Sequence, residues 1–357
     1  INFIEDKSAK TIPVKSVTSP YYNNIVNTIN QVDNAKSLIE GPVKYVIISD
    51  RMFEETLQPF ILWKTQKGFN VIAAYTDEIG TTKEAIKTYL QDLYENPDDE
   101  VAPTFILFVG DVGQIPVFAG TAGSHVTDLY YCEYTGDKLP EVFYGRFSAT
   151  SVEQLQPQID KTLEVEKFNI PDPSYLNNVV LIAGVDADYA PTNGNGFVNY
   201  ASTYYINSEN GVNAMNYLYP ESGSSDEQIR ADISGGVALA NYTAHCSSGG
   251  WGDPTFVNSH VASMTNTHMY PLMIGNCCLS NKFDDASCFG ETLLRTADKG
   301  AVGYIGGSNN TYWDEDYFWG VGLASVSANP TYERSGLGSY DRFFHLNGES
   351  KEDWYIT

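Results

Sequence analysis

The sequence has no run of about 18 apolar residues, so no segment is predicted to span a membrane. It is also poor in basic residues: 21 Lys and Arg stand against 45 Asp and Glu, and the net charge is −24. Because nucleic-acid and anionic-membrane binding depend on Lys and Arg, this balance argues against both kinds of partner. Apolar residues make up 42% of the 357 residues, which is enough for two domains with sizeable cores.

Cysteine is scarce, and its spacing excludes a zinc site and a disulfide framework. There is no CxxC pair, and no two His residues lie at i, i+4 beside a Glu. An odd number of cysteines leaves at least one thiol free or bridged to another molecule. With 25 Tyr and only 18% charged residues, the composition is typical of a secreted or surface protein, in which a free thiol can indicate nucleophilic catalysis. The five cysteines are Cys132, Cys246, Cys277, Cys278 and Cys288.

Two series of alternating strand and helix patterns follow a polar segment, residues 1–42, which we interpret as an N-terminal extension, a linker or the remnant of a pro-segment. The first series predicts an α/β subdomain over residues 43–174, and the second predicts another over residues 175–357, with mostly parallel sheets flanked by helices. Pro59 is expected to kink the second predicted element or to delay its start. The predicted strands are 43–49, 68–75, 104–109, 142–147 (an edge strand), 178–183, 214–219, 237–242, 271–275 and 301–305, and the helices are 52–66, 81–95, 151–167, 196–207, 225–233 and 289–299.

Three predicted strands of the second series are followed at once by reactive residues: Asp186, His245 and the pair Cys277-Cys278. Ligand and catalytic groups of open α/β sheets gather at the carboxyl ends of strands, so these residues meet if the three strands are neighbours. A thiolate is a nucleophile, an imidazole can move its proton, and a carboxylate can orient that imidazole. The spacing by itself is equally compatible with a structural His and a buried core Cys.

The segments Asn241-Tyr242-Thr243-Ala244-His245 and Ile274-Gly275-Asn276-Cys277-Cys278 resemble the gingipain family of cysteine peptidases, more closely its lysine-specific than its arginine-specific members. Further similar blocks occur in the same order, at 63–69, 126–131, 299–301, 312–317 and 338–341, so the resemblance extends from about residue 43 to residue 340. It implies a caspase-like fold in which the second subdomain carries the active site.

The resemblance also implies a role for each reactive residue. Cys278 is the expected nucleophile, His245 the acid and base, and Asp186 its orienting partner. The backbone N–H groups of Cys278 and Cys246 are expected to form the oxyanion hole. Cys277 is expected to point away from the site and to be buried.

Position 246 departs from the family, which usually has Gly after the His. If the backbone needs a positive φ there, a Cys is strained. Cys246 is also close enough in the expected site to form a disulfide with Cys278 and silence the enzyme. Three interpretations stay open: a harmless substitution, a redox latch, and an inactive homologue that acts as a surface binding module.

The resemblance also implies a pocket for a lysine side chain. A buried cation needs a carboxylate partner, and Asp316 is the expected one, with Trp313 beside the lysine stem. Composition alone instead favours interpreting the acidic run 314–316 as a solvated loop. The other expected pocket residues are Thr243, Tyr312 and Asn276.

Structural calcium is expected from similar acidic positions in the family, and no catalytic cofactor is expected. Thr135 stands where the family has one carboxylate, which should weaken the first site. The alternative is ordinary surface charge. The expected ligands are Asp111, Asp137, Glu141 and the Leu139 carbonyl in one site, and the Phe283 carbonyl and Glu291 in another.

The sequence therefore predicts a bacterial cysteine endopeptidase, secreted or at the cell surface, that cleaves proteins or peptides after Lys. An inhibitory pro-domain is expected to be encoded upstream. The alternatives are a sorting transpeptidase of the same fold and the silenced homologue that position 246 suggests.

Overall fold

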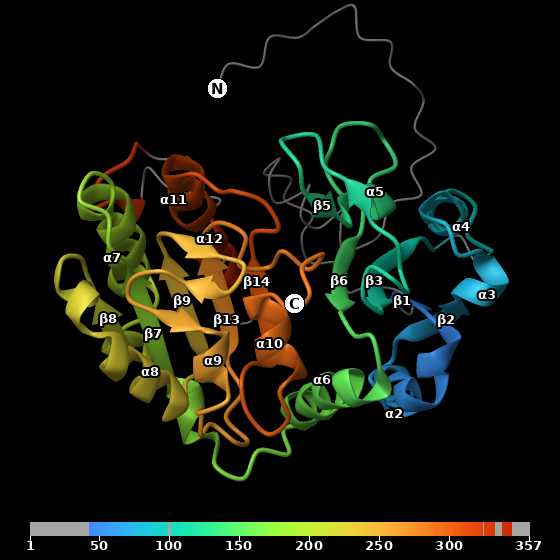
Figure 1. Cartoon of the computed structure of the whole chain (residues 1–357), viewed down its shortest axis with the longest axis horizontal. Helices are drawn as coiled ribbons and strands as arrows, with labels where there is room; N and C mark the ends of the chain where they lie inside the picture. The colour runs from blue at the N-terminus through green and yellow to red at the C-terminus, as the bar shows by residue number, and fades with distance from the viewer. Residues whose placement is uncertain (1–42, 99–100, 324, 333–337, 345–357) are drawn as a thin grey trace, which may run out of the picture.

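The computed structural model describes residues 43–98, 101–323, 325–332 and 338–344. The segment 1–42, interpreted above as an extension, linker or pro-segment remnant, lies outside the described residues. Two parallel sheets stand side by side, each with helices on its faces (Figure 1). In the described ranges, the helices are too short or too polar to cross a bilayer.

The first lobe, residues 43–166, holds a four-stranded parallel sheet with the order β2-β1-β3-β6. Segment 142–147, predicted as an edge strand, provides the edge strand β6. The elements of this lobe are β1 (Lys44–Ser49), η1 (Arg51–Phe53), α2 (Glu54–Gln66), β2 (Asn70–Tyr75), α3 (Thr76–Ile79), α4 (Lys83–Glu95), β3 (Pro103–Val109), β4 (Phe118–Ala119), β5 (Val126–Thr127), α5 (Leu129–Cys132), β6 (Phe143–Phe147) and α6 (Val152–Glu166).

The central strand β1 is buried along nearly all its length and has the apolar run Val46-Ile47-Ile48 at its centre, because both of its faces are covered. Ile48 packs with residues of α4 on one face, and Ile47 packs with residues of α2 and α6 on the other. Thr82 caps α4 by accepting a hydrogen bond from Ala85 N. The predicted later start at Pro59 is wrong: α2 runs through Pro59 from Glu54, because neighbouring apolar side chains of the helix are buried in the core.

The second lobe, residues 178–344, holds a five-stranded parallel sheet with the order β14-β13-β9-β7-β8. The five strands of this sheet and the helices α7, α8 and α10 lie within a few residues of the predicted bounds, whereas α11 was not predicted. The elements of this lobe are β7 (Asn178–Ala183), α7 (Asn195–Tyr204), β8 (Asn213–Tyr217), α8 (Asp226–Ser234), β9 (Leu239–Thr243), β10 (Cys246–Ser247), β11 (Gly250–Trp251), β12 (Phe256–Val257), α9 (Asn258–Val261), β13 (Leu272–Asn276), α10 (Phe289–Arg295), β14 (Gly303–Gly306), α11 (Trp313–Val321) and α12 (Ser339–Phe344), with the short helices η2 (Pro173–Asn177), η3 (Ala190–Gly194), η4 (Ser208–Asn210) and η5 (Glu221–Ser224).

The strand order brings together the three strand ends that the sequence singled out. β9 lies between β13 and β7, and the register pairs Thr243 with Asn276 on one side and with Ala183 on the other. Because all three strands are parallel, their carboxyl ends open on the same edge of the sheet. The prediction that these strands are neighbours is confirmed.

A small antiparallel sheet, β10-β11-β12, follows β9 directly and was not predicted. Its strands have two residues each, too short for a periodic pattern. Trp251 is buried and stacks on Tyr242, with ring centroids 4.8 Å apart. This packing holds the chain that leaves β9 against the core of the lobe.

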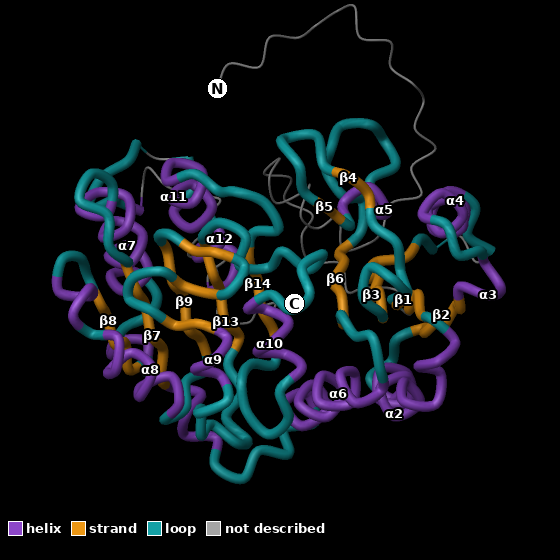
Figure 2. The backbone as a smooth tube through the Cα atoms, in the orientation of Figure 1, coloured by secondary structure: helices purple, strands orange, loops and turns teal. Residues whose placement is uncertain are grey.

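The two lobes are joined by polar contacts between α6 and α10, which lie close together in Figure 2. Lys161 of α6 is buried and donates hydrogen bonds to the carbonyls of Leu293, Thr296 and Lys299, at or just past the end of α10. These carbonyls have no partner within the helix, so the ammonium caps the helix from the other lobe. Burial lowers the pKa of Lys161 to about 7.

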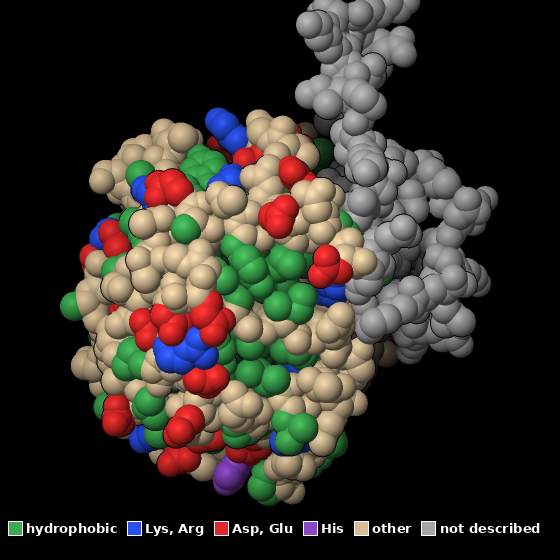
Figure 3. Space-filling model, turned by 90° about the vertical axis from the view of Figure 1, so that its right-hand side faces the viewer, with side chains coloured by type: hydrophobic (Ala, Val, Ile, Leu, Met, Phe, Trp, Pro, Cys, Tyr) green, Lys and Arg blue, Asp and Glu red, His purple; other side chains and the backbone are tan. Residues whose placement is uncertain are grey.

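The outer face of the first lobe carries acidic side chains spread among apolar and basic ones (Figure 3). On this lobe Arg51 pairs with Asp77 and Glu78, and its guanidinium covers the ring of Tyr75. Exposed ion pairs of this kind contribute little to stability. The lobe's stability therefore rests mainly on the two buried cores of its sheet.

Candidate active site

Asp186 and His245 are in direct contact at the edge of the second sheet. His245 Nε2 lies 2.8 Å from Asp186 Oδ2. An ionised carboxylate only accepts hydrogen bonds, so Nε2 carries the proton and Nδ1 is the acceptor of the neutral ring. The imidazole therefore has one nitrogen fixed by Asp186 and one free to exchange a proton.

Four donors surround the Asp186 carboxylate. Besides His245, the backbone N–H groups of Asp188 and Tyr189 donate to Oδ1, and Trp313 Nε1 donates to Oδ2 over 3.2 Å. Partial burial raises the pKa of Asp186, but the hydrogen bonds from His245, the two N–H groups and Trp313 outweigh burial and leave the pKa below its ordinary value. Asp186 is thus held ionised beside the imidazole.

Trp313 has a role that the sequence did not indicate. Its ring meets His245 edge to face, with centroids 5.8 Å apart, and stacks on Tyr189 at 6.0 Å. Trp313 therefore orients both members of the Asp186–His245 pair, although it was expected only beside a lysine stem. No sequence signal could show this, because the residues lie 68 to 127 positions from Trp313.

Cys278 lies two residues past β13, as His245 lies two residues past the neighbouring strand β9. Its thiol is free and half-buried, and Sγ accepts a hydrogen bond from Thr311 N over 3.4 Å. The two other free thiols are unsuited to attack, because burial raises the pKa of Cys288 to about 12 and raises that of Cys132 well above its ordinary value. Cys278 is therefore the best-placed nucleophile of the five cysteines.

Cys246 forms a disulfide with Cys277, and the Cα atoms are 5.4 Å apart. The prediction that Cys246 could bridge Cys278 is wrong in this structure, since the partner of Cys246 is the buried preceding residue. The expected backbone strain is also absent: Cys246 begins β10, and it is not among the described non-glycine residues with positive φ. An extended backbone accepts any side chain there.

In the described part of the chain, the backbone N–H groups of Cys246 and Cys278 have no protein acceptor. Gly252 N donates to His245 O, so Cys246 and Trp251 form a non-hydrogen-bonded pair of the β10–β11 ladder. The N–H of Cys246 therefore points away from β11. Among the described residues, none accepts a hydrogen bond from Cys278 N.

Asp316 lies in the first turn of α11 and is 6% exposed, whereas Asp314 and Glu315 are exposed. Its Oδ2 accepts a hydrogen bond from the hydroxyl of Thr311 over 2.8 Å, and in the described residues no Lys or Arg pairs with it. Burial raises the pKa of Asp316 to about 6, partly offset by the bond from Thr311. The solvated-loop interpretation therefore does not apply to this carboxylate.

Thr311 connects the thiol with this buried carboxylate, through its backbone to Cys278 and through its hydroxyl to Asp316. Sequence analysis did not identify Thr311 as a residue of the site. Of the other expected pocket residues, Asn276 donates its side-chain N–H to Asp316 O, Thr243 is buried opposite Asn276, and Tyr312 is 67% exposed just before α11.

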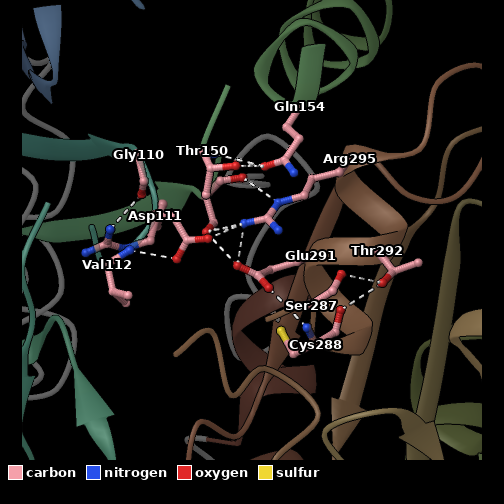
Figure 4. A network of polar contacts seen from close by, with 12 residues as sticks. Gly110, Asp111, Val112, Thr150, Gln154, Ser287, Cys288, Glu291, Thr292 and Arg295 are labelled. Atoms are coloured by element: carbon pink, nitrogen blue, oxygen red, sulfur yellow. Dashed lines mark hydrogen bonds and ion pairs between the residues drawn. The ribbon is translucent and has the colours of Figure 1, made fainter. Parts of the chain in front are cut away.

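The residues expected to bind calcium are partnered by protein donors. Arg295 contacts Asp111 Oδ2 at 2.9 Å and Glu291 Oε1 at 2.7 Å, and it also bonds Ser148 (Figure 4). This network links the end of β3 and the loop after β6 with α10. A guanidinium thus lies where a cation shared by these carboxylates would lie.

The two remaining expected carboxylates, Glu141 and Asp137, are also engaged. Glu141 accepts hydrogen bonds from Tyr134 N and the Thr135 hydroxyl, and Asp137 accepts one from Leu139 N. The ring of the nearly buried Phe283 packs under Arg146. Across the described ranges, no three His, Cys, Asp or Glu side chains converge as metal ligands, so this arrangement does not fit a bound calcium ion and calcium binding stays a prediction.

Solved structures share this fold. One titled "Structure of Protease" matches with a TM-score of 0.80 and 41% identity, covering 85% of this chain and 68% of that chain. The Arg-specific cysteine proteinase gingipain R matches with a TM-score of 0.67 and 25% identity, over 79% of this chain and 66% of that one. These matches confirm the predicted caspase-like α/β fold.

Sequence comparison agrees. Lys-gingipain of Porphyromonas gingivalis is 40% identical over 335 residues, which is 91% of this chain, and gingipain R2 of the same species is 28% identical over 308 residues. The chain spans 19% of the length of that Lys-gingipain. The sequence model of peptidase family C25 matches residues 39–347. The chain therefore belongs to peptidase family C25.

Proposed function

We propose that this chain is a cysteine endopeptidase that cleaves peptide bonds after Lys. The observation that carries the proposal is the buried Asp316 carboxylate, which has no cationic partner among the described residues and is joined to the free thiol of Cys278 through Thr311. A buried carboxylate raised in pKa is stabilised by an incoming cation. A substrate ammonium group supplies that cation.

The residues around Cys278 support an acyl-transfer mechanism. His245 Nδ1 takes the proton of the thiol, and Sγ attacks the carbonyl carbon of the scissile bond. The tetrahedral oxyanion is received by backbone N–H groups of Cys246 and Cys278. His245 then gives its proton to the leaving amine, which leaves a thioester on Cys278. Water attacks that thioester with His245 as base, and the acid product and free thiol are released.

Lysine is favoured over arginine because the pocket offers one carboxylate oxygen pair and a hydroxyl. A compact ammonium needs a point partner, which Asp316 and Thr311 provide. A guanidinium instead needs a planar, bidentate partner. In this structure one oxygen of Asp316 is already bonded to Thr311.

The relatives also support two proposals about context. The pro- and mature domains of RgpB of Porphyromonas gingivalis form a solved complex, whose structure matches this chain with a TM-score of 0.66 and 27% identity. We propose that an inhibitory pro-domain acts on this chain in the same way, and that the protein works outside the bacterial cell or at its surface. The low number of basic residues and the free thiol are compatible with that setting.

Paired fluorogenic peptides that differ only in P1 Lys or P1 Arg test the proposed specificity. We expect kcat/KM to be at least ~100-fold higher for Lys, because one charged hydrogen-bonded contact is worth that much when it is buried. Similar rates for Arg would contradict the lysine assignment while keeping the peptidase. Transfer of the acyl group to an added amine, in preference to water, would instead support the transpeptidase.

Calcium binding has its own test. If the loop at residues 137–141 binds calcium without help from Asp111, the site is weak, and a dissociation constant of about 1 mM would add only ~1.4 kcal/mol at 10 mM ligand. We expect a chelator to leave Tm unchanged and 10 mM calcium to raise it by a few degrees at most. Glu141→Gln is the matched variant, and a large Tm drop on chelation would show that Arg295 does not replace the ion.

A further inference from the structure

The disulfide of this protein joins the two residues next to its reactive side chains. Cys246 follows His245, and Cys277 precedes Cys278. The bridge therefore cross-links the loop that leaves β9 with the loop that leaves β13. It closes a separation of 31 residues at a place where the two parallel strands have already ended.

Apart from this bridge, the two loops meet through apolar packing, since Ala244 and Trp251 share one buried core with Cys277. The last strand pair is Thr243 with Asn276, and no hydrogen bond in the described part of the chain connects residues 244–252 with residues 277–281. The His245 side chain is 61% exposed. Within the described residues, the Cys246–Cys277 bond is therefore a covalent link between the loops that no hydrogen bond duplicates.

The disulfide also lies beside the two N–H groups of the expected oxyanion hole, for which the described residues offer no acceptor. One belongs to Cys246 itself, and its ladder pairing with Trp251 leaves the N–H free. The other belongs to Cys278, which is bonded through the peptide unit to Cys277. Cys277 is fully buried in the core of the lobe, so the bridge anchors the exposed His245 loop to a fixed point.

We propose that the Cys246–Cys277 disulfide is a positioning device that sets the separation of the two oxyanion-binding N–H groups. This inference rests on the proposed acyl transfer. Donors must lie within a few tenths of an ångström of the developing oxyanion to stabilise it, and each well-placed donor accounts for roughly 100- to 1,000-fold in rate. Loosening one loop against the other weakens that contact in the transition state.

The device acts on turnover and leaves lysine binding unchanged. Asp316 and Thr311 lie on or before α11, outside both cross-linked loops. Asp186, which contacts His245, follows a third strand, β7, and is likewise outside both cross-linked loops. Removal of the bridge is therefore expected to lower kcat and to leave KM for a P1 Lys peptide nearly unchanged.

The test uses the double variant Cys246→Ala/Cys277→Ala, which removes the bridge and leaves no new thiol beside Cys278. We expect kcat for a P1 Lys peptide to fall ~10- to 100-fold, with KM within about twofold of wild type. A peptide aldehyde with P1 lysinal forms a hemithioacetal oxyanion, and its inhibition constant should rise by the same factor as kcat falls. Alkylation of Cys278 by iodoacetamide needs no oxyanion hole, so its rate should stay unchanged.

Two controls separate positioning from loss of stability. Leu90→Ala removes a buried side chain of α4 in the first lobe, and it should lower Tm while kcat is retained. Thiol counting in denaturant should give three free thiols for wild type, because one bridge uses two of the five cysteines. The same count after exposure to the assay reductant shows that the bridge is intact during the assay. All assays are run well below the Tm of the least stable variant.

Wild-type kcat in the double variant, with the bridge shown to be absent, would overturn the inference. Equal losses in kcat and in iodoacetamide alkylation would also overturn it, because the bridge would then act on the thiolate or on the fold. A wild-type enzyme that hydrolyses no P1 Lys peptide is a separate result: it overturns the proposed function and the inference that rests on it.

Discussion

Cys278→Ala is expected to lower kcat/KM for a P1 Lys peptide by at least ~10,000-fold, leaving a folded protein with nearly unchanged Tm. The thioester cannot form without Sγ, and the remaining rate comes only from binding and oxyanion stabilisation. Cys278 is half-buried and contacts Thr311 through two weak sulfur hydrogen bonds, one donated by Thr311 N and one accepted by Thr311 O, so its loss costs little stability. Steady-state hydrolysis and a thermal melt measure the two quantities.

Cys132→Ala is the matched control for this variant. Cys132 is a free thiol in the core of the first lobe, and burial keeps its pKa well above the ordinary value, so its removal should affect stability and not turnover. If Cys278→Ala retained more than about 1% of the wild-type rate, Cys278 would not be the nucleophile. Loss of activity in Cys132→Ala at full folding would point to the same conclusion.

Asp316→Asn is expected to reduce kcat/KM for P1 Lys by at least ~1,000-fold and at the same time to stabilise the free protein. A lysine ammonium buried against an amide loses its charged partner, a loss of several kcal/mol when the pair is desolvated. When no substrate is bound, the same buried charge destabilises the folded protein. Asn keeps an oxygen that can accept the hydrogen bond from Thr311.

The direction of the stability change follows from the pKa of Asp316. Burial raises it from 3.8 to about 6, so the folded state binds the proton more tightly than the unfolded state. The stabilising effect of the protonated form is complete below about pH 4 and is lost as the pH rises to about 6. At pH 7.5 the charge therefore costs up to roughly 3 kcal/mol, and Asp316→Asn should recover about 1–3 kcal/mol.

Denaturant unfolding at pH 7.5 and pH 5 measures this effect, with a smaller gain expected at pH 5. Glu315→Gln is the matched control, because Glu315 lies in the same turn of α11 and is exposed. It should change neither P1 Lys hydrolysis nor stability by much. If Asp316→Asn destabilised the protein, or if Glu315→Gln lost lysine cleavage equally, Asp316 would not be the buried acceptor of the substrate ammonium.

Much of the fold follows from local patterns in the sequence. Buried strands such as β1 and β7 are β-branched runs, and helices such as α4 have apolar residues at helical spacing and a Thr cap. These signals depend on neighbours in the chain, so they could be predicted. The order of the strands could not be predicted, and the sequence analysis could say only that the reactive residues meet if their strands are neighbours. The two-residue strands β10, β11 and β12 could not be predicted either. Both features depend on pairing between segments that the local pattern does not show.

Residue types and their order along the chain show which chemistry is available: a thiol, an imidazole and a carboxylate, each just past a strand, in the blocks of one peptidase family. Which of these groups face each other follows from the folded chain. It bonded Cys246 to Cys277 instead of Cys278, buried Asp316 while leaving its acidic neighbours exposed, and placed Thr311 between the thiol and that carboxylate.

The expected calcium ligands show the same division. Their acidic character is visible in the sequence, but Arg295, which lies 184 residues from Asp111, takes up the carboxylates of Asp111 and Glu291. The physical reason is common to all of these cases. Residue type fixes what a group can do, whereas burial, partner and direction are set by contacts between segments that are far apart in the chain.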